Sequence, residues 1–191
     1  MQQVDEPSRF MAEVRDLLGP PPEEIAAAGG GYARLEARLG ITFPVVYKSF
    51  MDTYGPGMVS GDIRLYHPTI PFPNFFTLDE FITHLLDLVE LEPMFFAPEL
   101  DVPRFDLGFG VGDLIPFGEA LNWVGLYFII SEDEDWEVLE YSGGEYERSG
   151  LGFGPWFLRY LHGGGSESYY VTAKPERMPR QFMPAADFRR F

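Results

Sequence analysis

The fold of this chain is decided by the stretch Leu114–Gly163, which reads LIPFGEALNWVGLYFIISEDEDWEVLEYSGGEYERSGLGFGPWFLRYLHG. Within it, Trp123–Ile130 is almost entirely apolar or aromatic, which is typical of a strand that is covered on both faces. We therefore expect this run at the centre of a sheet. Trp136–Tyr141 again consists of residues that favour strands. The two runs are predicted to form an antiparallel hairpin, and the rest of the chain is expected to be arranged around it.

The turn of this hairpin is strongly acidic, and residues 131–135 contain no apolar side chain. A carboxylate cluster on a rigid hairpin can occupy a basic site of a partner and raise the association rate. The alternative is a solvated turn, because repulsion between neighbouring charges in water is only about 1 kcal/mol per pair. For Trp136, which directly follows the turn, the alternative is that its side chain packs in the core. The predicted partner-binding site comprises Glu132, Asp133, Glu134, Asp135, Trp136 and Glu137.

Length and composition indicate one folded domain. The chain has 191 residues, of which 46% are hydrophobic and 16% aromatic, so its composition is far from that of a disordered chain. It contains no cysteine, which excludes disulfides and thiolate metal sites and favours a cytoplasmic protein. We expect neither a targeting leader nor a membrane-spanning segment.

The formal net charge of −16 argues against direct binding to nucleic acid, which requires Lys and Arg side chains. From Lys174 onward there are five basic and two acidic residues, so this tail carries +3 and the remainder −19. Such a field steers cationic partners toward the acidic part. The alternative is that acidity only maintains solubility.

The tail, residues 166–191, is also rich in Phe and Pro and has no periodicity. We predict that it docks on the acidic domain, with Phe182 and Phe188 as apolar anchors and with Arg189 and Arg190 near carboxylates. The alternative is a free arm that binds a partner.

Apolar residues at helical spacing predict the helices of the chain. The clearest helix spans residues 43–54, where Pro44 suits the first turn and Gly55 suits a C-terminal cap. Thr77 and Glu80 have the spacing of a capping box, which predicts a helix that starts at Thr77. Further helices are predicted at 8–18, within 23–39 with a break at the glycines 29–31 and the stable part from Tyr32, and over 153–162.

The remaining segments are interpreted from their turn residues. Met58–Tyr66 is predicted to be a hairpin that turns at Gly61 and Asp62. Pro93–Gly112 is rich in Pro, Phe, Asp and Gly and shows no period. We predict a long irregular connection there.

No catalytic motif stands out in the sequence. His67, His84 and His162 have no partners at metal-ligand spacing, and the glycines of residues 108–112 lack the spacing of a phosphate-binding loop. Ser49 and Ser60 have no triad context. We therefore predict no catalytic, cofactor-binding or metal-binding residue, and an enzyme is the last of three functional alternatives.

Three pieces of the chain, in order, resemble the SUKH superfamily of Smi and Knr-like proteins. The first piece comprises Leu39-Gly40, Phe43-Pro44, Tyr47-Lys48, Phe50 and Tyr54-Gly55-Pro56-Gly57, and it ends at His67-Pro68. The second comprises Leu114-Ile115-Pro116-Phe117-Gly118, Leu126-Tyr127 and Trp136-Glu137-Val138. The third runs from Phe157-Leu158 through Leu161 to Gly163. The end of the tail is similar to that of actinobacterial members. One departure is Asn122-Trp123-Val124, where many relatives carry Asn-Gly-Asp.

This resemblance implies an α+β fold with a mixed, mostly antiparallel sheet, a central β-hairpin and packed helices. It implies a SUKH-like domain over residues 32–165, after an N-terminal helical extension over 1–31 and before the tail over 166–191. Bacterial members are mostly immunity proteins that bind and block a toxin, often a nuclease or nucleic-acid deaminase. The resemblance thus implies a protein partner, a basic toxin domain, and no small-molecule substrate. A regulatory scaffold of the Smi and Knr type is the alternative.

Overall fold

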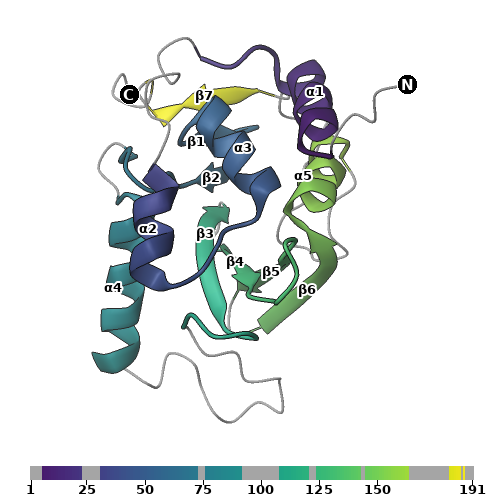
Figure 1. Cartoon of the computed structure of the whole chain (residues 1–191). Helices are drawn as coiled ribbons and strands as arrows, with labels where there is room; N and C mark the ends of the chain where they lie inside the picture. The colour runs from purple at the N-terminus through teal and green to yellow at the C-terminus, as the bar shows by residue number, and fades with distance from the viewer. Residues whose placement is uncertain are drawn as a thin grey trace.

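The computed structural model describes residues 6–22, 31–72, 76–91, 108–120, 124–142, 145–163, 181–185 and 187. The strands among them form one sheet, and the helices pack beside it (Figure 1). The helices are α1 (Glu6–Leu18), α2 (Gly31–Leu39), α3 (Val45–Tyr54), α4 (Leu78–Leu91) and α5 (Phe153–Leu161). The strands are β1 (Gly57–Val59), β2 (Ile63–Leu65), β3 (Leu114–Ala120), β4 (Val124–Ile129), β5 (Glu137–Ser142), β6 (Glu145–Gly152) and β7 (Phe182–Pro184).

The predicted α+β class is confirmed. The strand order is β6-β5-β4-β3-β2-β1-β7, so the first six strands follow one another across the sheet. Every neighbouring pair of described strands is antiparallel, where the prediction allowed a mixed sheet. Within the described residues, no helix combines the length and apolar character that crossing a bilayer requires.

Helix α3 forms where its sequence pattern predicted. Pro44 directly precedes it, and Gly55 at its C-terminal end has a φ of 70° and donates its N–H to the carbonyl oxygen of Met51. Glycine adopts this left-handed conformation without the steric cost that a Cβ atom adds, so the helix ends there. The buried side chains of the helix are Tyr47, Phe50, Met51 and Tyr54.

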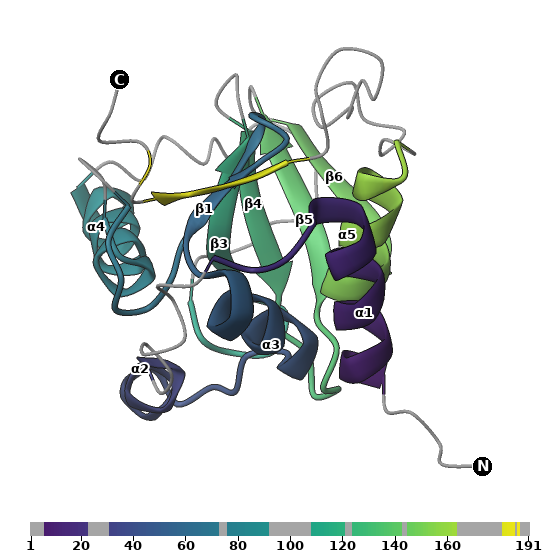
Figure 2. The same ribbon diagram turned by 90° about the horizontal axis from the view of Figure 1, so that it is seen from above.

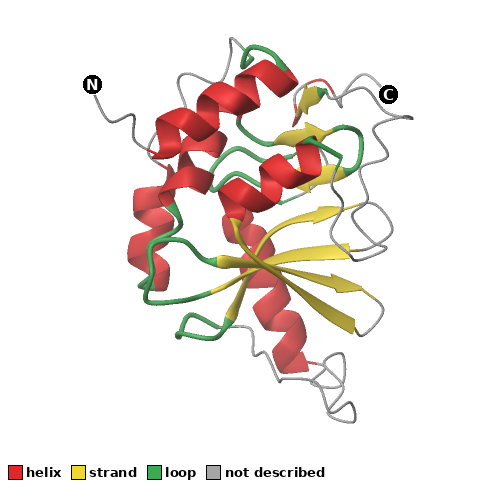
Figure 3. Ribbon diagram, turned by 90° about the vertical axis from the view of Figure 1, so that its right-hand side faces the viewer, coloured by secondary structure: helices red, strands yellow, loops and turns green. Residues whose placement is uncertain are grey.

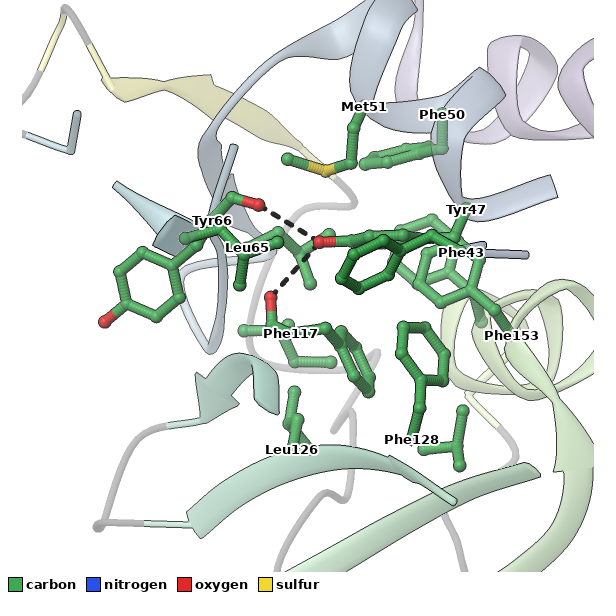
Figure 4. Packing of buried hydrophobic residues seen from close by; sticks show 14 of the residues in the cluster. Phe43, Tyr47, Phe50, Met51, Leu65, Tyr66, Phe117, Leu126, Phe128 and Phe153 are labelled. Atoms are coloured by element: carbon green, nitrogen blue, oxygen red, sulfur yellow. Dashed lines mark hydrogen bonds between the residues drawn. The ribbon is translucent and has the colours of Figure 1, made fainter. Parts of the chain in front are cut away.

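The main core lies between one face of the sheet and the layer formed by α1, α2, α3 and α5 (Figures 2 and 3). At its centre, the hydroxyl of Tyr47 donates to the carbonyl oxygens of Tyr66 and Phe117, at 3.0 and 3.4 Å (Figure 4). The aromatic rings of Phe128 and Phe153 pack edge-on against the same tyrosine. Because its hydroxyl has acceptors, Tyr47 joins α3 to the sheet without leaving a buried polar group unsatisfied.

The predicted hairpin is confirmed as β4 and β5, with Gly125 paired to Tyr141 and Ile129 paired to Glu137. Strand β4 is covered on both faces, since Phe128 belongs to the main core and Tyr127 to a smaller buried cluster on the other side. It is an interior strand, but the middle position belongs to β3. Trp123 lies outside the described residues.

Strand β6 was not predicted. It pairs with β5 through Tyr146 opposite Tyr141 and Arg148 opposite Leu139. Its sequence, EYERSGLG, mixes charges with two glycines and gives no clear alternation of apolar and polar residues. Residues 145–152 therefore form a strand because they pair with β5, and their own sequence pattern does not predict one.

The first hairpin is confirmed as β1 and β2, with Val59 paired to Ile63. The turn begins at Ser60, one residue earlier than predicted, and both Ser60 and Gly61 have positive φ values of 53° and 70°. The predicted helix start is also confirmed, because Thr77 and Glu80 exchange capping-box hydrogen bonds at the start of α4.

The described part of the tail lies on the sheet edge as β7. Its strand pairs with β1, and the ring of Phe182 lies 5.2 Å from that of Tyr54 and 6.2 Å from that of Phe50. The predicted contacts of residues 188–190 fall outside the described residues, as do residues 23–30 and most of the Pro93–Gly112 connection.

Candidate partner-binding surface

The acidic tip stands on the turn between β4 and β5, and Trp136 supports this turn from inside. The indole is only 3% exposed, and its ring centroid lies 5.7 Å from that of Phe43 and 6.0 Å from that of Phe128. Its Nε1–H donates to the carbonyl oxygen of Ser131 at 3.2 Å, and the backbone N–H of Asp133 donates to Ser131 Oγ at 3.2 Å. Core packing, the alternative for Trp136, is therefore confirmed, and the indole holds the turn in place.

Asp135 is directed toward helix α5. Its carboxylate accepts a hydrogen bond from the backbone N–H of Phe153, the first residue of the helix. A Cβ atom added to Gly152 would lie 1.9 Å from Asp135 Oδ2, so the close approach depends on glycine. Burial, and then the nearby charge of Glu6, raise the pKa of Asp135. The carboxylate thus contacts the N-terminus of α5, but the residue is exposed, and its place in the partner-binding site stays a prediction.

Glu137 ties β5 to β6. Both of its carboxylate oxygens accept from Arg148 Nε at 3.1 Å, and Oε1 also accepts from the backbone N–H of Gly150 at 2.9 Å. The hydrogen bond with Arg148 is the main reason that the pKa of Glu137 is lowered. Its carboxylate is therefore already paired within the fold, and its assignment to the partner-binding site stays a prediction.

Besides Asp135, three predicted residues are exposed: Glu132, Asp133 and Glu134. They border a hollow of about 340 Å³, which we call the acid-rimmed hollow. Its walls come from three segments distant in sequence: residues 40–45 at the start of α3, residues 109–111 and the β4–β5 turn. Its apolar lining comprises Ile41, Phe43, Val45, Phe109, Val111, Ile130 and Trp136. Among the described residues that line it there is no Lys, Arg or His.

Backbone hydrogen bonds hold the walls of the hollow together. Gly112 N–H donates to the carbonyl oxygen of Ile130 at 2.8 Å, and Ile130 N–H donates to that of Asp113 at 2.9 Å. The Asp113 side chain also accepts from Gly110 N–H at 2.7 Å. These bonds fix the loop of residues 108–113 against the end of β4.

The histidines have structural surroundings. His67 is fully buried, its Nδ1 accepts from the backbone N–H groups of Thr69 and Ile70, both at 3.2 Å, and burial lowers its pKa to about 4. His84 stacks on Phe76. Across the part of the chain that the structure describes, no three His, Cys, Asp or Glu side chains gather as metal ligands would.

Sequence reasoning missed the apolar part of this surface. Val45 is 46% exposed and Val111 is 66% exposed, and both line the hollow. Val45 precedes the buried stripe of α3, and Val111 stands between two loop glycines. Neither position carries a periodic signal, so only the fold brings the two side chains together.

Comparisons with models of protein families, with curated proteins and with solved structures found no match for this chain, so its place in the SUKH superfamily remains a prediction from the motifs quoted above.

Proposed function

We propose that this chain is an immunity protein that binds a toxin of the nuclease or nucleic-acid deaminase type in the cytoplasm and neutralises it stoichiometrically. The observation that carries the proposal is the row of exposed carboxylates Glu132, Asp133 and Glu134 on a turn anchored by Trp136. Sites that hold a phosphate backbone are basic, so a fixed row of carboxylates is complementary to them. The resemblance to SUKH immunity proteins supports the same reading.

Two physical features favour tight and fast binding at this surface. The net charge of −16 attracts a basic partner over long range and raises its association rate. The turn is held by hydrogen bonds before any partner arrives, so little conformational entropy is lost on binding.

A regulatory scaffold is the second candidate. The acid-rimmed hollow favours it, because a small cavity with exposed apolar side chains can accept short segments from several proteins. A scaffold would bind several partners weakly, whereas an immunity protein binds one partner tightly.

The test is affinity capture from the native cell at about 0.05 M and about 0.5 M salt. Wild type is compared with the tip variant E132K/D133K/E134K and with the control variant D16K/D87K/D187K. The control makes the same change in charge at exposed carboxylates elsewhere on the protein.

We expect one dominant partner that is toxic when expressed alone and harmless when co-expressed with the wild-type chain. The tip variant is expected to lose this partner and the control variant to keep it. Several weakly bound proteins and no protection from toxicity would reject the immunity function in favour of the scaffold.

A further inference from the structure

We propose that the acid-rimmed hollow binds a segment of the partner in which an aliphatic or aromatic side chain is flanked by Lys or Arg. The inference rests on the proposed function and names the chemistry of the toxin segment that is bound. The apolar side chain would enter the hollow, and the flanking cations would pair with Glu132, Asp133 and Glu134.

Exposed apolar side chains indicate that the hollow accepts an apolar group. Three large apolar side chains are exposed among the described residues, Val45, Phe76 and Val111, and two of them line this hollow. Phe109 beside them is only partly buried. Exposed apolar side chains that converge from separate segments mark a surface that becomes more stable when it is covered.

The carboxylates at the rim of the hollow indicate that the occupant is also basic. Three exposed carboxylates border the hollow, and none of the described side chains that line it is basic. A purely apolar occupant would remove water from these carboxylates without replacing their hydrogen bonds, which is costly. A purely basic occupant would leave Val45 and Val111 uncovered. Only an occupant with both an apolar and a cationic side chain would cover the two valines and also pair with the carboxylates.

The hollow is also formed in advance. Its walls are joined by the backbone hydrogen bonds between Ile130 and the 112–113 segment, and Trp136 closes the turn from beneath. A second copy of this chain is a poor occupant, because two molecules of charge −16 repel each other most strongly where their acidic tips approach.

The test follows backbone amide shifts of the full-length chain by ¹⁵N NMR during titration with three synthetic peptides. KKLKK carries both chemistries, KKSKK only the charge and QQLQQ only the apolar side chain. We expect KKLKK to shift the amides of Gly112, Ile130 and Asp133 and to bind at least about fivefold more tightly than either of the other two. Equal binding of KKLKK and KKSKK, or shifts confined to another face, would overturn the proposal.

Variants of the chain show which side chains supply the apolar and the electrostatic contribution to peptide binding. V45S/V111S is expected to abolish the preference for KKLKK over KKSKK, and E132Q/D133N/E134Q to abolish the preference for KKLKK over QQLQQ. The matched control is F76S, which removes the third exposed apolar side chain and leaves both preferences intact. If F76S had the same effect as V45S/V111S, the assignment to the hollow would be wrong.

The chain's own basic tail is a competing occupant. If R189E/R190E, without any peptide, shifted the amides of Gly112, Ile130 and Asp133, the hollow would hold the tail and the proposal would fail. One result would reject the hollow as the docking site without rejecting the proposed function. A captured toxin whose affinity is unchanged by V45S/V111S overturns the hollow as its docking site but leaves the immunity function standing.

Discussion

At the scale of single residues, His67 is a polar side chain that tolerates full burial only in its neutral form. Its Nδ1 accepts two backbone N–H groups, and burial lowers its pKa from 6.5 to about 4. In the unfolded chain the imidazole takes up a proton near pH 6.5, whereas the folded state resists until about pH 4. The unfolded state therefore binds more protons in this window, and stability falls as the pH falls.

We predict that His67 accounts for a loss of about 3 kcal/mol in the free energy of unfolding between pH 7.5 and pH 4. In H67N the side-chain oxygen can accept the same two N–H groups, as in an Asx-turn, but it does not titrate. Urea unfolding of both proteins across this pH range measures the effect. If the two stability curves run parallel, His67 is not the buried neutral base that the structure shows.

Asp135 is the second residue whose environment opposes its charge. Burial and Glu6 raise its pKa, while the N–H of Phe153 needs its oxygen as an acceptor. D135N keeps the acceptor and removes the charge, so we predict stability equal to or above that of wild type at pH 7. D135A loses the helix cap and should unfold about 1 kcal/mol more easily.

Urea unfolding at pH 7 separates these variants. The folded wild type takes up a proton on Asp135 more readily than the unfolded chain does, so any advantage of D135N should shrink as the pH falls. A D135N protein that is as unstable as D135A would show that the charge, and not the acceptor, caps α5.

The same residue shows why the partner-binding site was only partly predictable. Six adjacent residues carry the acidic pattern, but the partners of Asp135 and Glu137 are Phe153 and Arg148, which follow them by 18 and 11 residues. Trp136 is buried against Phe43, far earlier in the chain. Which of these side chains already have partners within the fold depends on long-range contacts, which no local pattern reveals.

At the scale of elements, strand β7 is held by few contacts. It pairs with β1 over three residues, with Ser60 N–H donating to Gln181 O at 2.7 Å and Ala185 N–H donating to Pro56 O at 3.0 Å. Phe182 packs against Tyr54. A short edge strand of this kind depends on its anchoring side chain.

We predict that F182A releases β7 from the sheet edge without unfolding the domain. The amides of Ser60 and Ala185 should exchange their hydrogens at least about tenfold faster, while amides of β4 keep their protection. M183A, on the neighbouring residue of the same strand, is the control. Unchanged exchange at Ser60 in F182A would show that backbone pairing alone holds the strand.

Elements were predictable where the signal is local. Helix α3 has Pro44 and Gly55 at its ends, and α4 has the Thr77 capping box, so both were placed closely. The position predicted for β4, the centre of the sheet, belongs to its neighbour β3, and the existence of β6 and β7 was not predicted. Those features depend on strands that pair across the molecule, and β6 has a sequence without alternation.

At the scale of the whole molecule, charge and shape act on different steps of binding. The net charge of −16 acts over long range on the approach of a basic partner, whereas the acid-rimmed hollow acts only on contact. Charge reversal at the tip should therefore slow association most, and V45S/V111S should mainly speed dissociation. The composition alone predicted the sign of the field, and only the fold placed three exposed carboxylates beside two exposed valines.

The central claim is that Glu132, Asp133 and Glu134 steer a basic toxin to this surface. The most direct measurement is the association rate of the captured toxin with wild type, with E132K/D133K/E134K and with D16K/D87K/D187K, followed by stopped flow across a range of salt concentrations. The account predicts that the tip variant associates at least about tenfold more slowly at low salt and loses most of its salt dependence, with a much smaller effect in the control. Equal slowing of both variants, or none in the tip variant, would contradict it.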